Sequence, residues 1–170
     1  NMYITFRFAH NITAAQSRNI YNRSQLTMNT NEEMLQFLHK SAKMSVDSTT
    51  KLLSKTEDRQ LRQELISELD GYKRFERESS SLLRSHGLKP QNPGISAKIM
   101  SDVGMAVNTM MDSSASHIAE IMINGSNMGV IKMSKHLNRN TDCPEKTRNL
   151  CSDMINYEKN RMEKLSSYLR

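Results

Sequence analysis

Proline and glycine are rare in this chain, and they lie at a few places only. Its 170 residues contain three prolines and six glycines, and Pro90, Pro93 and Gly94 fall within one short segment. These residues interrupt helices more strongly than any others, so the long stretches between them are free to be helical. Aromatic residues make up only 5% of the chain and Trp is absent, which disfavours sheets. The sequence therefore predicts an all-α protein.

Apolar residues recur at three- and four-residue steps in the stretches 31–54, 57–85 and 144–169. Thr30 or Asn31 is expected to cap the first helix, and Asp142 or Cys143 the last. The second is expected to end at His86 and Gly87, where glycine permits a left-handed cap. Because so few residues separate the first two helices, we expect antiparallel neighbours in an antiparallel four-helix bundle.

A third helical stretch, 96–137, is much longer than the others. Its 42 residues would span about 63 Å as one straight helix. We therefore expect a kink or a break. One candidate is Asp112-Ser113-Ser114, which can cap a new helix, and the other is the segment from Gly125 to Gly129.

Residues 1–27 differ from the rest of the chain. They contain Arg7, Arg18 and Arg23 but no acidic residue. Met28 opens a stretch that resembles the start of a chain. We interpret residues 1–27 as an N-terminal extension outside the core, and residues 28–170 as a single helical bundle domain.

The charge pattern and the cysteines exclude some classes of protein. The net charge is +6, but basic and acidic residues alternate along 57–85, which is typical of a solvated helix face and disfavours nucleic-acid binding. No apolar run approaches the ~20 residues of a membrane span. Cys143 and Cys151 are too far apart on one helix to pair, which favours a reducing, cytoplasmic location.

A helical bundle could hold metal ions between carboxylates, so we searched for that site. Ferritin-like di-metal sites use Glu-x-x-His motifs, and none occurs here. The candidate ligands for a non-standard site are Glu68, His117, Glu120 and Glu158. A simpler interpretation places Glu68, Glu158 and Asp47 at the solvent edge of their helices, with His117 hydrogen-bonded inside. A third is a buried ion pair between His117 and Glu158.

Small residues mark two helical stretches. Gly125, Ser126 and Gly129 share one face, which favours close packing within the bundle or across a dimer. Ser41, Ser45 and Ser48 likewise interrupt the apolar stripe of the first helix and predict close helix contact. The 13 methionines suit irregular core gaps, with a methionine-rich binding groove as the alternative.

Two segments resemble small bacterial ferritin-like bundle proteins of unknown function. They are DSSASHIAEIMINGSNMG at 112–129 and MNTNEEML at 28–35. The resemblance covers about Met28 to Leu169 and implies a ferritin-like four-helix bundle of bacterial origin. It carries no catalytic residue over, and the missing Glu-x-x-His motifs argue against ferroxidase activity.

The function expected from these observations is non-enzymatic and needs no cofactor. The bundle would act through self-association, as a homo-oligomer, or through binding a protein partner. The alternative is a ferritin-like protein that binds iron, manganese or zinc at the four candidate ligands.

Overall fold

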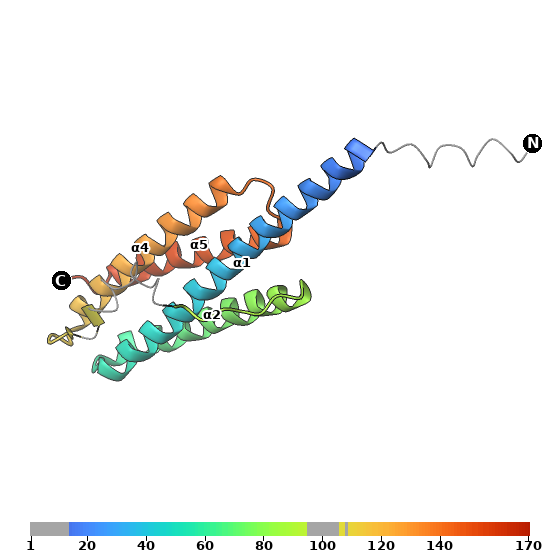
Figure 1. The fold of residues 1–170 in the computed structure, drawn as a ribbon. Helices are drawn as coiled ribbons and strands as arrows, with labels where there is room; N and C mark the ends of the chain where they lie inside the picture. Colours follow the sequence, from blue (N-terminus) through green and yellow to red (C-terminus); the bar gives the residue numbers. More distant parts are fainter. Residues whose placement is uncertain (1–13, 95–105, 108) are drawn as a thin grey trace, which may run out of the picture.

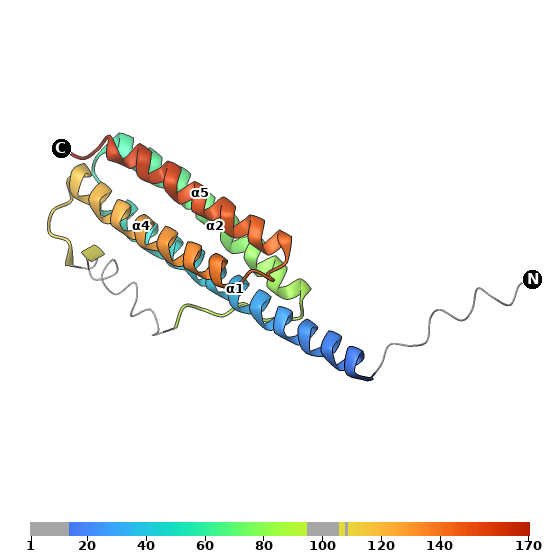
Figure 2. The same cartoon turned by 90° about the horizontal axis from the view of Figure 1, so that it is seen from above.

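The computed structural model describes residues 14–94, 106–107 and 109–170, with the backbone alone for residues 14–29. Its described part is all-helical, with the four long helices α1 (Ala14–Lys55), α2 (Arg59–Ser85), α4 (Ala115–Arg139) and α5 (Glu145–Ser166). They lie side by side in both ribbon views (Figures 1 and 2). The most extensive packing is of α1 on α2 and of α4 on α5. No helix of the described residues is long and apolar enough to cross a membrane.

Helix α1 begins 17 residues before the predicted start at Asn31, so that predicted boundary was wrong. Its first turns extend beyond the ends of the other helices (Figures 1 and 2). Asn31 does not cap the helix. It is buried, and its side-chain oxygen accepts a hydrogen bond of 2.6 Å from the Thr147 hydroxyl on α5. Thr30 and Asn31 resemble an N-cap because threonine and asparagine favour helix starts. Neither residue type prevents a helix from continuing.

Local chemistry accounts for the other helix ends. The Asp58 side chain accepts from the Leu61 N–H at 2.8 Å and starts α2. The predicted cap after Ser85 is present: Gly87 has φ +73°, and the Leu88 N–H donates to the Leu83 carbonyl. Helix α5 starts directly after Pro144, which occupies the N-cap position without a side-chain hydrogen bond, so the predicted caps Asp142 and Cys143 were wrong.

The third predicted stretch is interrupted at the first of the two expected places. Residues 110–114 are not helical, and the Ser114 hydroxyl accepts from the His117 N–H at the start of α4. Through Gly125 to Gly129, the other candidate, α4 continues without a break. Residues 95–105 and 108, which belong to the same predicted stretch, lie outside the described residues.

The hydrophobic core has two clusters along the helices. The first includes Met34 and Leu38 of α1, Phe75 of α2, and Cys151 and Met154 of α5. The second contains the following buried residues: Leu52, Leu61, Leu65, Val107, Ile118, Ala119, Ile121, Met122 and Leu165. Along each helix, the buried residues between the two clusters are polar: Thr49, Glu68, Ser126, Glu158 and Arg161. The candidate site lies between the two clusters, where these residues are found.

Candidate functional site: a cavity beside a buried ion cluster

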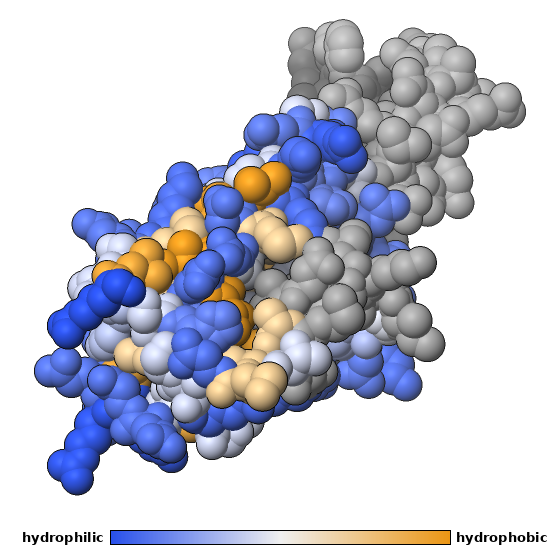
Figure 3. Space-filling model, turned by 90° about the vertical axis from the view of Figure 1, so that its left-hand side faces the viewer, coloured by the Kyte–Doolittle hydropathy of each residue, from blue (hydrophilic) through white to orange (hydrophobic). Residues whose placement is uncertain are grey.

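An apolar cavity of about 600 Å³ lies where α1 faces α4, with part of α5 in its wall. Figure 3 shows hydrophobic side chains gathered on one face of the molecule among hydrophilic ones. The apolar lining is mostly methionine and branched aliphatic side chains: Phe37, Met44, Leu52, Ile121, Met122, Met128, Val130, Met133, Met154 and Ile155. The volume falls within the range of pockets that bind small molecules.

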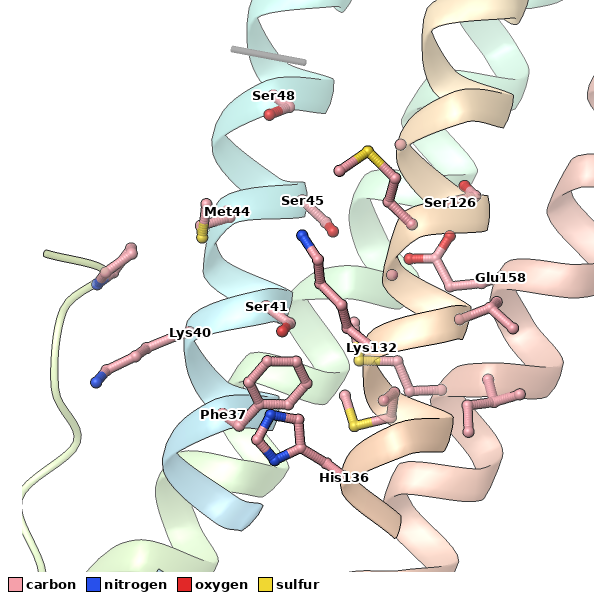
Figure 4. A pocket seen from close by; sticks show the side chains of 18 of the residues that line it. Phe37, Lys40, Ser41, Met44, Ser45, Ser48, Ser126, Lys132, His136 and Glu158 are labelled. Atoms are coloured by element: carbon pink, nitrogen blue, oxygen red, sulfur yellow. The ribbon is translucent and has the colours of Figure 1, made fainter. Parts of the chain in front are cut away.

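The small residues of the two facing helices create this space. Ser41, Ser45 and Ser48 line the cavity from α1, and Gly125, Ser126 and Gly129 from α4 (Figure 4). A Cβ atom added to Gly129 would meet nothing within 4 Å. Within the bundle, the described residues therefore do not pack closely against Gly129, and close packing across a dimer, the other alternative, stays a prediction. Small side chains here leave a gap that larger ones would have filled.

A buried ion cluster borders the cavity. Arg161 of α5 lies with its Nε 2.7 Å from Glu68 Oε2 of α2, and with its Nη1 3.2 Å from Glu158 Oε2. The same Nη1 donates to Ser126 Oγ of α4 at 2.9 Å and to the Tyr72 hydroxyl. Tyr72 in turn donates to Glu158 at 2.8 Å. One guanidinium thus links α2, α4 and α5, and Ser126, Glu158 and Arg161 also line the cavity.

The cluster contains two carboxyl groups and one cation. Burial raises the pKa of Glu68, and the nearby Arg161 offsets this only in part. Burial alone would lower the pKa of Arg161, but Tyr72 and the two carboxylates raise it, so the guanidinium stays charged. Burial also raises the pKa of Tyr72, which keeps its hydroxyl protonated as a donor. With both carboxylates ionised, the cluster carries one excess negative charge.

The structure brings only two of the four predicted metal ligands together. Glu68 and Glu158 meet at Arg161, whereas His117 and Glu120 form a separate pair, 3.7 Å apart, in the first turns of α4. Among the described residues, no three His, Cys, Asp or Glu side chains group as metal ligands would. Arg161 lies between the two carboxylates.

The other interpretations of these residues also need correction. Glu68 and Glu158 are 5% and 4% exposed, so the prediction that they face solvent was wrong, although Asp47 is exposed as predicted. His117 is half-buried and lies beside Glu120, and the predicted pairing with Glu158 is not formed. We did not predict Arg161 as a site residue. Arg161 lies three residues after Glu158, and both lie between the apolar residues Met154 and Leu165 on one helix face. This spacing was the sequence signal that could have indicated an ion pair.

Polar contacts also border the cavity near the loop after α2. The Gln36 side chain donates to the Lys89 carbonyl at 2.9 Å and accepts from the Gln91 N–H at 3.0 Å. Phe37 of α1 stacks on His136 of α4, with ring centroids 4.1 Å apart. Burial lowers the pKa of His136. These contacts attach the loop to α1 and link α1 to α4 beside the cavity.

A serine and a histidine lie close together elsewhere in the bundle. His39 Nδ1 is 3.3 Å from Ser79 Oγ, and both side chains are buried. The Ser79 hydroxyl donates to the Phe75 carbonyl at 2.7 Å. Neither residue lines the cavity. The pair therefore satisfies buried polar groups and offers no accessible nucleophile.

Comparisons with protein-family models, with characterised proteins and with solved structures found no match to this chain. Because no family is shown, the fold and the site define only a structural class: all-helical proteins with an apolar cavity beside a buried ion cluster.

Proposed function

We propose that this protein is a non-enzymatic binding protein that takes up a small apolar molecule in the cavity between α1 and α4. The observation that carries the proposal is the cavity itself, about 600 Å³ in volume and with a mainly apolar surface. Methionines contribute much of that wall, and their flexible side chains adapt to apolar ligands of different shapes. The cavity provides an enclosed, mainly apolar surface, which suits the binding of an apolar ligand.

We further propose an antiparallel, ferritin-like arrangement of the four helices. Three residues join α1 to α2, and five join α4 to α5. Helices α1 and α5 run from the first core cluster to the second, and α2 and α4 run from the second to the first. Such short connections favour antiparallel neighbours. The bacterial origin and the cytoplasmic location stay predictions from the sequence.

Self-association is the second candidate function. The observation that favours it is the open space at Gly129, where an added Cβ atom would meet nothing within 4 Å. A helix of a second copy could approach that face closely. Metal binding, the alternative from the sequence, has no such support, because Arg161 already lies between Glu68 and Glu158.

Binding of a neutral apolar dye tests the first candidate. We expect N-phenyl-1-naphthylamine to bind the full chain saturably, with one site per chain and increased fluorescence. Ser45→Leu places a large side chain in the cavity and should weaken binding by about tenfold, equivalent to ~1.4 kcal/mol. Ser54→Leu makes the same change at an exposed position of α1 that does not line the cavity, so its affinity should equal that of the wild type.

Two outcomes would contradict this proposal. One is the absence of saturable dye binding by the folded wild-type chain. The other is equal affinity in the wild type and in Ser45→Leu, which would place the dye elsewhere. Circular dichroism on each variant establishes that it is folded.

A further inference from the structure

The ion cluster gives the cavity one polar stretch of wall within a mainly apolar surface. Three of its members, Ser126, Glu158 and Arg161, line the cavity. Figure 4 shows Ser126 and Glu158 on the wall that faces the serines of α1. A ligand that fills this space lies against buried polar groups. The hydrogen bonds that these groups can still form therefore decide which head group the cavity accepts.

The guanidinium of Arg161 has one nitrogen left to donate. Its Nη1 donates to the side chains of Tyr72, Ser126 and Glu158. Its Nε is fully buried and lies 2.7 Å from Glu68 Oε2. Its Nη2 makes no hydrogen bond with the residues that the structure describes, and it is not among their fully buried atoms without a partner. The N–H groups of Nη2 are therefore left to donate to a ligand.

The carboxylate of Glu158 has one oxygen left to accept. Its Oε2 accepts from both Tyr72 and Arg161, whereas its Oε1 accepts from Tyr72 alone among the described residues. A carboxylate oxygen has two lone pairs, so Oε1 can accept one more hydrogen bond. The polar wall thus offers both a donor and an acceptor. A head group that uses only one of them leaves the other without a partner once water is displaced, which costs free energy.

Charge disfavours an ionised head group at this wall. Arg161 is paired with Glu158 and Glu68, and burial raises the pKa of Glu68, which reduces the negative charge of the cluster. An ammonium group that entered here would meet the guanidinium, and a carboxylate would meet Glu158. Either group would also lose its hydration in a mainly apolar cavity.

From this geometry we infer that the ligand is an amphiphile with an apolar chain and an uncharged head group that both donates and accepts, of which a hydroxyl is the simplest. The head group donates to Glu158 Oε1 and accepts from Arg161 Nη2. A hydroxyl satisfies both residues without adding charge, so it needs no surplus charge in the cluster. The inference rests on the proposed function, because it assigns a head group to the molecule bound in the cavity.

Competition with the dye by four ligands of equal carbon number tests this head group. They are decanol, its isomer methyl nonyl ether, decylamine and decanoate, each below its micelle concentration. The ether and the carboxylate can only accept, and the ammonium group can only donate. We expect decanol to bind about tenfold more tightly than each of the others. Non-specific partition into an apolar space would favour the ether, and the net charge of +6, or Lys40 and Lys132 in the cavity wall, would favour decanoate.

Glu158→Gln assigns the head group to one residue. The change removes the negative charge that opposes a carboxylate beside Arg161. We therefore expect decanoate to gain about tenfold relative to decanol, while dye affinity is retained. Glu163→Gln makes the same change at an exposed position of α5 that does not line the cavity, so its ratio of the two affinities should equal that of the wild type.

Three results would overturn the inference or the proposal beneath it. The first is an ether or a charged ligand that binds the wild type as tightly as decanol does. The second is an unchanged ratio of decanoate to decanol affinity in folded Glu158→Gln. If Glu158→Gln does not fold, the order of the four ligands on the wild type decides alone. The third, failure of the dye and of all four ligands to bind, would instead overturn the proposed function.

Discussion

At the scale of single residues, α5 packs closely against Gly71 on α2. A Cβ atom at Gly71 would overlap the Tyr157 hydroxyl oxygen of α5. The Tyr157 ring has little freedom to move, because it packs edge-on against Tyr72 and Phe75 and its hydroxyl donates to the Glu68 carbonyl at 3.1 Å. Glycine is therefore required here by the close approach of α5.

Substitution by alanine should have opposite effects on stability at Gly71 and at Gly129, which lines the cavity. Gly71→Ala forces the Tyr157 ring to shift, and we expect the free energy of unfolding to fall by about 1–3 kcal/mol despite the better helix propensity of alanine. Gly129→Ala is the matched control, since its Cβ meets nothing. It should raise the free energy of unfolding by about 0.5–1 kcal/mol. Urea denaturation of both variants measures the difference, and equal effects would show that the Tyr157 contact does not limit the packing.

At the scale of the helices, one buried guanidinium joins α2, α4 and α5. Arg161 contacts Glu68 of α2, Ser126 of α4 and Glu158 of its own helix. Facing this cluster across the cavity, α1 carries the small residues Ser45 and Ser48. Helix α1 therefore leaves space there and contributes no residue to the cluster. The cavity and the ion cluster are thus two results of the same break in the apolar stripes.

The raised pKa of Glu68 makes stability depend on pH in a definite direction. The folded chain holds a proton on Glu68 more tightly than the unfolded chain, whose pKa is close to the ordinary value of 4.5. The corresponding stabilisation is complete below that pH and is lost as pH rises through the raised pKa. Glu68→Gln lacks this loss.

We therefore expect Glu68→Gln to gain free energy of unfolding relative to the wild type as pH rises from about 4 to about 8. Denaturation in urea at a series of pH values gives the difference. Asp70→Asn, which removes an exposed carboxylate from the same helix, is the matched control. A difference between Glu68→Gln and wild type that stays constant with pH, or falls, would contradict the raised pKa.

At the scale of the whole molecule, the two helix pairs pack less extensively on each other than the helices within each pair do. The cavity lies where α1 of one pair faces α4 of the other, and the small face of α4 borders it. An interface between copies at this face would cover apolar surface that the described residues leave open.

Sedimentation velocity on the full chain tests that self-association. We expect a dimer at high micromolar concentration, and we expect Gly129→Leu to shift the population to monomer because its side chain blocks the close approach of helices. Asn138→Leu adds the same side chain at an exposed position near the end of α4 and should leave the dimer intact. A wild-type chain that remains monomeric across the concentration range would exclude this candidate.

The sequence by itself determined the elements of this protein. The spacing of apolar residues, with Gly87, Ser114 and Pro144 at helix ends, predicted α2, α4 and α5 to within a few residues, because caps and periodicity act over a few neighbouring positions. The start of α1 was missed, since Thr30 and Asn31 resemble a cap but lie within a continuing helix.

Only the tertiary structure decided what the polar and small residues do. Glu68, Ser126 and Arg161 lie on three helices, and no local pattern shows that they meet at one level. The serines of α1 and the glycines of α4 could equally have packed together, and the arrangement of all four helices left a cavity between them. Burial and charge pairing depend on contacts between residues far apart in the chain, so the candidate site could be recognised only after the helices were placed.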